Sequence, residues 1–378
     1  MKNKLQQAEL REATLADGLA ICELLQSLGL KIPETSKEIG AHWRRLWSDN
    51  PAFSATEQKL SRGWVIEKSS KIVGFFGNIP RIYYFGSQKL IISVASQWAI
   101  KKEHRAKIHS LAKAYFSQKH ADVLMATTAN TAVGRLYQHY GGQKIPLEKH
   151  AQVLFWVLNP EKVLDSALRR KEVWGPISSV FLKLSQPALR AAHLFGFHKP
   201  NGQKNPVELL SIDAIDDNFD ELWARRQQER PRLLACRKAR SLHWYYGDSP
   251  FRNTFKLLTC SDGYLQGYCV ILGENIPGLE ISRLKIVDMF VEFDRETTVV
   301  NLLRAAYDYG RDKGYDILEW SGIPNTLWKT VLKQTPLRRT TPSWPLFYKP
   351  VTENFRKVLL EKQNWYITNF DGDTTLAN

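Results

Sequence analysis

The sequence has few cysteines and no residue spacing typical of a metal site. Its 378 residues include four cysteines, none of them in a Cys-x-x-Cys pair, and nine histidines without metal-ligand spacing. Four such cysteines are too few for a disulfide framework, which fits a reducing compartment. We therefore expect no metal centre and no disulfide-stabilised fold.

Long apolar runs and two common catalytic motifs are also absent. No segment holds 18 consecutive apolar residues, and the N-terminal MKNKLQQAELREA lacks the apolar core of a signal peptide. No P-loop and no Gly-x-Ser-x-Gly turn occurs, which argues against nucleoside triphosphate and serine-hydrolase chemistry. These absences predict a soluble, cytoplasmic protein.

The positive charge is concentrated in the first half of the chain. Residues 1–150 hold 22 Lys and Arg against 12 Asp and Glu, residues 151–204 hold 8 against 3, and residues 205–378 hold 23 against 23. The first half is therefore expected to bind a polyanion. Nucleic acid is not favoured, because the chain has no zinc-finger spacing, no helix-turn-helix signal and no basic tract interleaved with aromatic residues.

The stretch NTAVGRLYQHYG predicts a short helix that carries a tyrosine at a defined position. Asn130 is a favourable N-cap, apolar residues follow it at helical spacing, and Gly141 supplies a C-terminal stop. The stretch resembles the pattern Asn-x-x-Ala-x-x-Leu-Tyr-x-x-x-Gly of the GCN5-related N-acetyltransferases (GNATs), with Val133 in place of Ala. The resemblance implies that Tyr137 protonates the departing coenzyme A thiolate and that Asn130 contacts the pantetheine arm. Alternatively, Tyr137 is a core residue of an amphipathic helix.

The segment before this helix resembles the cofactor-binding part of the same family. KLIISVASQWAI predicts a long strand, and the resemblance implies that its end holds the pantetheine and polarises the thioester. The family then has Arg/Gln-x-x-Gly-x-Gly/Ala, which binds a pyrophosphate at a helix N-terminus. Ile108 replaces the first glycine of this pattern, and its β-branched side chain should either narrow the pyrophosphate site or force the loop to open. Alternatively, the segment binds no cofactor and is a solvated basic loop that only caps a helix. The implied cofactor residues are Gln97, Trp98, Ala99, Ile100, Arg105, Ala106, Lys107, Ile108, His109 and Ser110.

The two halves of the chain show the same order of predicted elements. WSDNP followed by a hairpin in the first half matches YYGDSP followed by a hairpin in the second, and Arg105 and Asp122 align with Arg295 and Asp316. A repeat is the simplest explanation, although chance produces such matches too. We predict an α/β (α+β) fold with two tandem GNAT-like domains, at 1–158 and 205–378. Each is expected to be a mixed, mostly antiparallel sheet flanked by helices.

The second copy lacks the cofactor signature. Glu296 follows Arg295 directly, and NTLWKTVLKQ carries Trp328 but no tyrosine. The second domain is therefore expected to bind no coenzyme A but to complete the acceptor cleft, as in double-domain acyltransferases, including relatives of the Fem aminoacyl transferases. Asp288, inside the apolar run KIVDMFV, is a candidate general base, or alternatively accepts a structural hydrogen bond from backbone. The DGD turn near the C-terminus is expected to be solvated.

The connector at 159–204 is expected to contain two helices, at 160–171 and 178–197. Their basic and apolar residues suit a membrane surface or a domain junction, and the junction is favoured. The principal hypothesis is an N-acyltransferase that uses acetyl-CoA or another acyl-CoA, without a metal, on a primary amine of a small molecule, sugar or peptide. The alternatives are a non-catalytic binding protein and a Fem-like transferase that uses aminoacyl-tRNA. The acceptor and the oligomeric state stay open.

Overall fold

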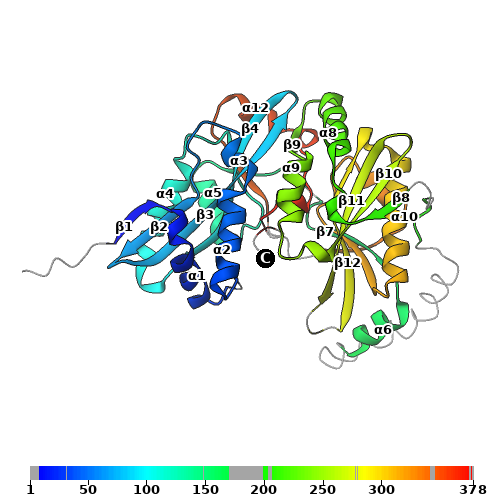
Figure 1. Cartoon of the computed structure of the whole chain (residues 1–378), viewed down its shortest axis with the longest axis horizontal. Coiled ribbons are helices and arrows are strands. Elements are labelled where there is room, and N and C mark those ends of the chain that lie inside the picture. Colours follow the sequence, from blue (N-terminus) through cyan, green and yellow to red (C-terminus); the bar gives the residue numbers. More distant parts are fainter. Residues whose placement is uncertain are drawn as a thin grey trace, which may run out of the picture.

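The computed structural model contains two mixed sheets, each flanked by helices (Figure 1). In each sheet one pair of neighbouring strands is parallel and the other pairs are antiparallel. The predicted α/β (α+β) fold with mixed, mostly antiparallel sheets is therefore confirmed. The structure describes residues 8–30, 32–147, 149–169, 199–202, 207–276, 278, 280–340, 345–373 and 376.

The first sheet is built mainly from the first half of the chain. Its central hairpin turns at Ser69 and Ser70, whose φ angles of 50° and 61° suit a tight hairpin turn. In spatial order the strands are β1 (Glu9–Glu12), β2 (Gly63–Lys68), β3 (Lys71–Phe85), β4 (Gln88–Ile100), β5 (Val123–Ala126), β15 (Phe347–Pro350) and β6 (Gln143–Lys144), and β9 (Leu233–Ala235) pairs with β3.

The second sheet repeats this strand order. The two aligned aspartates make the same contact: Asp122 Oδ2 accepts the N–H of Ile91 at 2.7 Å, and Asp316 Oδ2 accepts the N–H of Ser282 at 2.7 Å. In spatial order the strands are β8 (Val207–Leu210), β10 (Phe255–Ser261), β11 (Leu265–Ile276), β12 (Ile281–Val291), β13 (Ile317–Trp320), β7 (Gln152–Val157) and β14 (Leu337–Thr340).

The two halves exchange strands, and β9 of the second half also joins the first sheet. β15, from the second half, pairs with β5 and β6 in the first sheet, whereas β7, from the first half, pairs with β13 and β14 in the second. The boundary predicted at residue 158 therefore does not separate the two sheets. An apolar run such as QVLFWV does not specify which sheet edge its strand joins.

Helices cover the outer face of each sheet and fill the space between the sheets. Apolar faces of α4 (Ile108–Phe116) and α5 (Thr131–His139) pack on the first sheet, and that of α10 (Glu296–Asp312) packs on the second. The other α-helices of the described residues are α1 (Gly18–Ser27), α2 (Ser36–Trp43), α3 (Pro51–Ser54), α6 (Pro160–Arg169), α8 (Asp217–Glu229), α9 (Ala239–Leu242), α11 (Trp328–Leu332) and α12 (Asn354–Val358).

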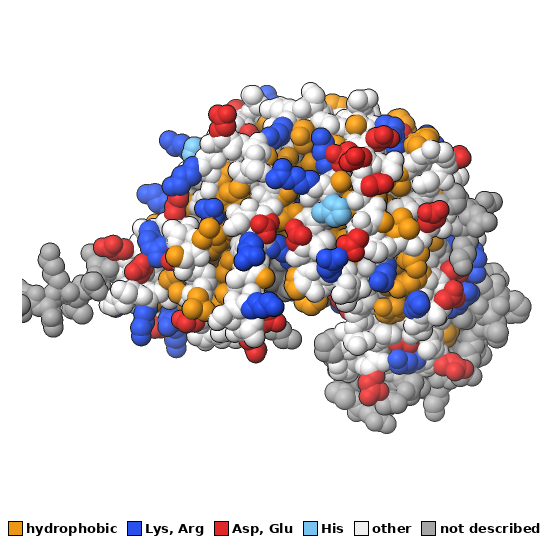
Figure 2. Space-filling view, viewed as in Figure 1, with side chains coloured by type: hydrophobic (Ala, Val, Ile, Leu, Met, Phe, Trp, Pro, Cys, Tyr) orange, Lys and Arg blue, Asp and Glu red, His pale blue; other side chains and the backbone are white. Residues whose placement is uncertain are grey.

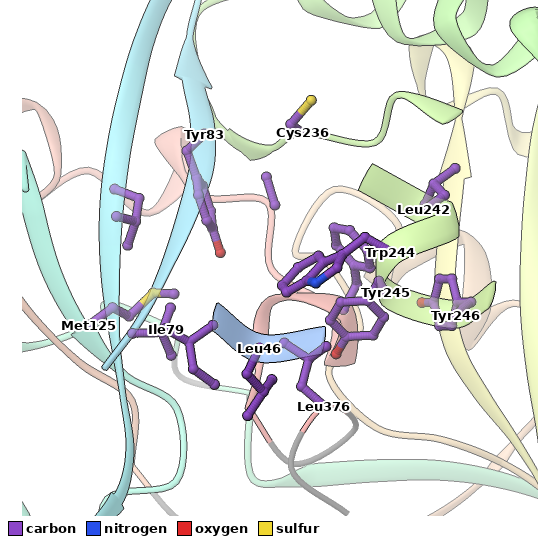
Figure 3. Packing of buried hydrophobic residues seen from close by; sticks show 14 of the residues in the cluster. Leu46, Ile79, Tyr83, Met125, Cys236, Leu242, Trp244, Tyr245, Tyr246 and Leu376 are labelled. Atoms are coloured by element: carbon purple, nitrogen blue, oxygen red, sulfur yellow. The ribbon is translucent and has the colours of Figure 1, made fainter. Parts of the chain in front are cut away.

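One hydrophobic core joins the two halves. Leu46 and Met125 of the first half belong to the same buried cluster as Leu242 and Tyr245 of the second (Figure 3). Two equivalent helical turns, residues 44–48 and 243–247, also bond to each other. Trp244 Nε1 donates to the Arg45 carbonyl at 2.8 Å, and Arg45 Nη2 donates to the Tyr245 carbonyl at 2.8 Å. The halves therefore share buried surface as well as strands.

Part of the connector and of the surface can be compared with the sequence predictions. The first predicted connector helix is present as α6, whereas the second, at 178–197, lies outside the described residues. None of the described helices combines the length and the apolar composition needed to cross a bilayer.

Lys and Arg side chains are spread over the visible face of the first half rather than gathered into one patch (Figure 2).

Candidate functional site

Strands β4 and β5 separate at one end and leave an open edge on β4. They pair in parallel only from Ile92–Val123 to Val94–Met125, whereas β4 continues to Ile100. Beyond Val94 one edge of β4 bonds to β3, and none of the described strands pairs with the other edge. Backbone N–H and C=O groups on that edge are available to a ligand. The predicted residues Gln97, Trp98, Ala99 and Ile100 all lie on this segment.

A β-bulge interrupts the open segment. Phe76 pairs with Trp98 and Gly77 pairs with Ser96, so Gln97 is an extra residue, and its φ is 35°. Gln97 Oε1 and Trp98 Nε1 are buried and have no hydrogen-bond partner among the described residues. A buried polar group without a partner costs about 1–3 kcal/mol. The unpaired Gln97 Oε1 and Trp98 Nε1 are therefore consistent with a ligand that binds this segment of β4 and supplies their hydrogen-bond partners.

Helix α5 places Tyr137 in a buried cluster with residues of α4, β4 and β5. Asn130 Oδ1 accepts the N–H of Val133 at 3.0 Å, which is the N-cap that the sequence predicts. Tyr137 is 1% exposed, and its hydroxyl lies 2.9 Å from that of Tyr115 on α4. Tyr115 in turn donates to the Ser93 carbonyl at 2.8 Å. Burial and then the neighbouring Tyr115 raise the pKa of Tyr137, so its phenol keeps its proton.

The C-terminal segment brings a carboxylate to the same place. Thr127 and Thr128, directly after β5, donate to Asp373 Oδ1 at 3.0 Å and 3.1 Å. Asp373 is 7% exposed, and burial raises its pKa. Its charge also contributes to the raised pKa of Tyr137, after burial and Tyr115. The expectation of a solvated acidic turn is therefore wrong, because Asp371 and Asp373 are both buried.

The segment predicted to hold a pyrophosphate is helical rather than an open loop. A 3-10 helix spans Lys102–Lys107 and runs into α4, and the Ile108 N–H donates to the Arg105 carbonyl. Ile108 stands where a glycine would favour an open loop, and non-glycine residues here adopt the helical conformation. The unbonded N–H groups of this helix are those at its first two positions, upstream of Arg105. Arg105, Ala106 and His109 are exposed, and Lys107, Ile108 and Ser110 are half-buried.

The second half has a similar opening, but acidic groups stand beside it. Pairing of β12 with β13 stops at Ile286, whereas β12 runs on to Val291. Asp294, which precedes α10, and Glu229 of α8 both pair with the buried Arg226. Arg232 pairs with the same two carboxylates, so this cluster carries no net negative charge. The missing cofactor signature of the second copy therefore rests on its sequence, in which Glu296, the first residue of α10, stands where the first half has Ala106.

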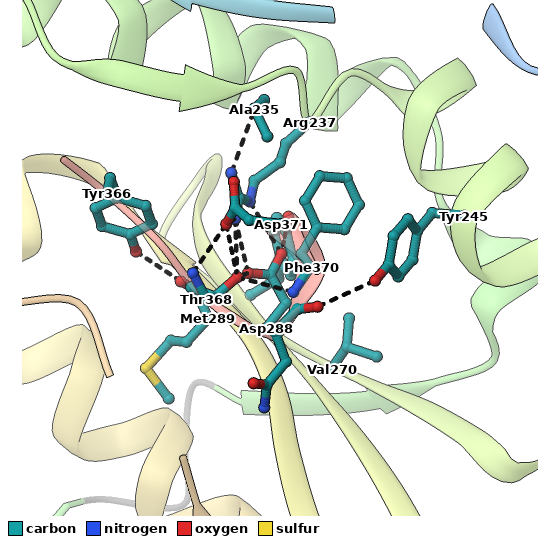
Figure 4. A network of polar contacts seen from close by, with 12 residues as sticks. Ala235, Arg237, Tyr245, Val270, Asp288, Met289, Tyr366, Thr368, Phe370 and Asp371 are labelled. Carbon is teal, nitrogen blue, oxygen red and sulfur yellow. Dashed lines mark hydrogen bonds and ion pairs between the residues drawn. The ribbon is translucent and has the colours of Figure 1, made fainter. Parts of the chain in front are cut away.

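Asp288 lies in a buried network rather than beside the opening in the first sheet (Figure 4). Arg237 donates to both of its oxygens, at 3.0 Å and 3.1 Å, and Thr368 donates to it at 2.7 Å. Tyr268 adds a further hydroxyl donor at 2.9 Å. The Asp288 and Arg237 side chains are 0% exposed. With these donors already bound, the carboxylate is placed for a structural role, and its partners are side chains instead of the backbone groups considered from the sequence.

A separate pocket of about 200 Å³ opens between the end of α5 and β15. Tyr140, Lys349 and Arg356 are among the residues that line it, and none of the predicted site residues does. Lys349 pairs in register with Leu124, toward the start of β5. The pocket therefore lies away from the opening at the other end of β5. No group of His, Cys, Asp and Glu side chains within the described ranges is suited to hold a metal ion.

Comparisons with known proteins identify the fold. No protein-family model and no curated protein matches the sequence. A GCN5-related N-acetyltransferase from Anabaena variabilis matches with a TM-score of 0.57 and 13% identity, over 92% of this chain and 73% of that one. A probable N-acyltransferase from Enterococcus faecalis, described as a conserved protein of unknown function, matches with a TM-score of 0.58 and 9% identity, over 92% and 73%. A GCN5-related N-acetyltransferase from Kribbella flavida matches with a TM-score of 0.57 and 10% identity, over 93% and 73%. The chain therefore has the fold of the GCN5-related N-acetyltransferases.

Proposed function

We propose that the chain is an acyl-CoA-dependent N-acyltransferase, with acetyl-CoA as the expected donor and a primary amine of a small molecule, sugar or peptide as the acceptor. The observation that carries this proposal is the open edge of β4, in a fold shared with proteins named as N-acetyltransferases. Strand N–H and C=O groups recur at a regular spacing and can bind an extended ligand that contains amides, such as pantetheine. Gln97, Trp98, Ala99 and Ile100 would supply these groups.

Basic residues at the start of the helix that leads into α4 suit the phosphates of the donor. Within the described chain, Lys101, Lys102 and Arg105 form no ion pair with a carboxylate. A helix N-terminus favours an anion, and its first N–H groups point toward it. The phosphate site would then lie nearer residues 101–105 than the predicted range 105–110.

The chemistry divides between the β4 edge and Tyr137. N–H groups of the edge would polarise the thioester carbonyl. The amine nitrogen attacks the thioester carbon, the C–N bond forms and the C–S bond breaks. Tyr137 gives its phenolic proton to the departing sulfur, and the proton that the nitrogen loses to a base or water as the amide forms balances it. Asn130 fixes the start of the helix that carries Tyr137.

Binding of acetyl-CoA to the purified protein, measured by calorimetry, tests the proposal. We expect binding by the wild-type protein and an affinity lower by about tenfold or more in Arg105→Glu, because the new charge repels a phosphate. Arg295→Glu changes the aligned residue of the second half and is the matched control. Its affinity for acetyl-CoA should equal that of the wild type.

Other outcomes would contradict the proposal. A folded wild-type protein that does not bind acetyl-CoA would favour a non-catalytic binding protein. Binding to charged tRNA that exceeds binding to acetyl-CoA and falls steeply with salt would favour aminoacyl transfer. Equal loss of affinity in Arg105→Glu and Arg295→Glu would show that the donor does not bind specifically in the first half.

A further inference from the structure

Asp373 is a buried carboxylate without a cation partner among the described residues. It is 7% exposed, and the groups that bond to its oxygens are the hydroxyls of Thr127 and Thr128. A buried aspartate is rarely left without an opposite charge, because burial of an unpaired charge is costly. Asp371 in the same segment differs, since it lies 3.4 Å from the Arg237 guanidinium. Asp373 is thus suited to a cation that a ligand supplies.

One oxygen of Asp373 has fewer hydrogen bonds than the other and can accept more. Oδ1 accepts from both threonine hydroxyls, whereas Oδ2 accepts only a longer contact of 3.3 Å from Thr128. An ionised carboxylate oxygen can accept more than one hydrogen bond. Thr127 and Thr128 directly follow β5, at the end where β4 and β5 separate. The carboxylate therefore stands at the opening, near Tyr137.

Several contacts fix the segment that carries Asp373. Its own N–H donates to Thr127 Oγ1 at 3.3 Å, and the Tyr245 hydroxyl donates to the Gly372 carbonyl at 3.2 Å. Arg45 Nη1 donates to the Leu376 carbonyl at 3.1 Å, and Leu376 belongs to the shared core (Figure 3). The position of Asp373 is thus set by both halves of the chain.

We propose that Asp373 binds the protonated amino group of the acceptor and takes its proton, so that a residue from the C-terminal segment completes the site in the first half. This inference rests on the proposed function and names the acceptor class as a cationic primary amine. The ammonium group gives one proton to Asp373, and the freed lone pair attacks the thioester carbon. The second proton leaves the nitrogen as the amide forms, replacing the proton that Tyr137 gives to sulfur. Asp373 then releases its proton to solvent.

The groups around Asp373 set its pKa and therefore the pH range in which it is ionised. Tyr137 faces it from α5, Arg81 of β3 donates to the nearby Phe370 carbonyl, and Asp371 is held by Arg237. Burial raises the pKa of Asp373, and the threonine hydrogen bonds oppose that rise. The basic form exists above this pKa. The value of kcat/KM should therefore fall as the pH drops through the pKa of Asp373.

The Asp373→Asn variant tests this proposal. The Asn amide has the size of the Asp carboxylate and its oxygen can accept hydrogen bonds from the threonines, but it cannot take a proton from the acceptor amine. Acetyl-CoA affinity is measured by calorimetry, and turnover is followed as loss of thioester absorbance with glucosamine, lysine and ethanolamine as probe amines. We expect wild-type affinity for acetyl-CoA and an unchanged Tm. The kcat/KM of the best probe amine should fall by about 10²- to 10⁴-fold, and the remaining activity should lack the acid limb of the pH profile.

Thr127→Val separates the proposed role from a purely structural one, because it weakens the attachment of the segment but keeps the carboxylate. Thr127→Val removes the hydrogen bond to Asp373 Oδ1 and the one from the Asp373 N–H, but the Thr128 hydroxyl still binds the carboxylate. Its loss of kcat/KM should therefore be smaller than that of Asp373→Asn by about tenfold or more. Equal losses in the two variants, or wild-type activity in Asp373→Asn, would overturn this inference alone. Acetyl-CoA binding without turnover of any probe amine would overturn the cationic acceptor. No binding of acetyl-CoA by the wild type would overturn the proposed function as well.

Discussion

Replacement of Tyr137 by Phe is expected to lower turnover by about 10²- to 10⁴-fold while acetyl-CoA binds with wild-type affinity. Phe retains the ring contacts with Phe116 and Phe347, at centroid distances of 4.8 Å and 5.7 Å, but has no proton to give. Tyr115 keeps the Ser93 carbonyl as an acceptor. The free energy of unfolding should therefore change by only about 1 kcal/mol.

Tyr140→Phe is the matched control for Tyr137→Phe. Its ring stacks on Phe116 at 4.5 Å, and its hydroxyl makes only a long 3.5 Å contact with the His109 carbonyl. Turnover should be close to wild type in this variant. Unchanged turnover in Tyr137→Phe would instead exclude the phenol as the acid and leave it as a core residue of an amphipathic helix.

Replacement of Asp288 by Ala is expected to lower the free energy of unfolding by about 3–5 kcal/mol. The substitution leaves the Arg237 guanidinium, which is 0% exposed, without the carboxylate that accepts two of its hydrogen bonds. It also removes the acceptor of the Tyr268 hydroxyl. Denaturant unfolding followed by fluorescence measures the change, provided that the transition is two-state.

Two further variants serve as controls for the loss of stability in Asp288→Ala. Glu353→Ala removes an exposed partner of Arg356 and should change the free energy of unfolding by less than about 0.5 kcal/mol. Asp288→Asn keeps an oxygen that accepts one of the hydrogen bonds made to Asp288 and should cost less than Asp288→Ala. A stable Asp288→Ala protein that has lost turnover would contradict the structural role and support Asp288 as a general base.

Features that depend on neighbouring residues could be predicted from the sequence. The N-cap at Asn130 is such a feature, because its partner Val133 is three residues away. The hairpin predicted after WSDNP, which turns at Ser69 and Ser70, is another. Asp122 and Asp316 were aligned by local order alone, and they make equivalent contacts. The overall fold could be predicted because these local elements occur in the order of the GCN5-related N-acetyltransferases and include a stretch that resembles their sequence pattern.

Features that depend on distant residues could not be predicted in this way. Asp373 and Thr127 are 246 positions apart, and only their contact shows that the DGD turn is buried. Tyr115 belongs to no motif in the sequence, and its link to Tyr137 depends on how two helices pack. The exchange of β7 and β15 depends on which sheet edge each strand meets. A local pattern contains none of this information.

One departure from the family pattern was visible in the sequence, but its consequence was not. Ile108 stands where the pattern has glycine, which predicted either a narrower site or an opened loop. The structure has a third arrangement, in which residues 102–107 form a 3-10 helix that runs into α4. This arrangement moves the free helix-start N–H groups away from Ile108 toward Lys102. The expected phosphate contacts shift accordingly.

A crystal structure of the protein with bound acetyl-CoA tests the central claim most directly. We expect the pantetheine beside residues 95–100 of β4, the phosphates near residues 101–105, and the sulfur close to the Tyr137 hydroxyl. No acetyl-CoA should be bound at the opening between β12 and β13 in the second half. Acetyl-CoA bound at β12, or bound with its sulfur away from both Tyr137 and Asp373, would contradict the account.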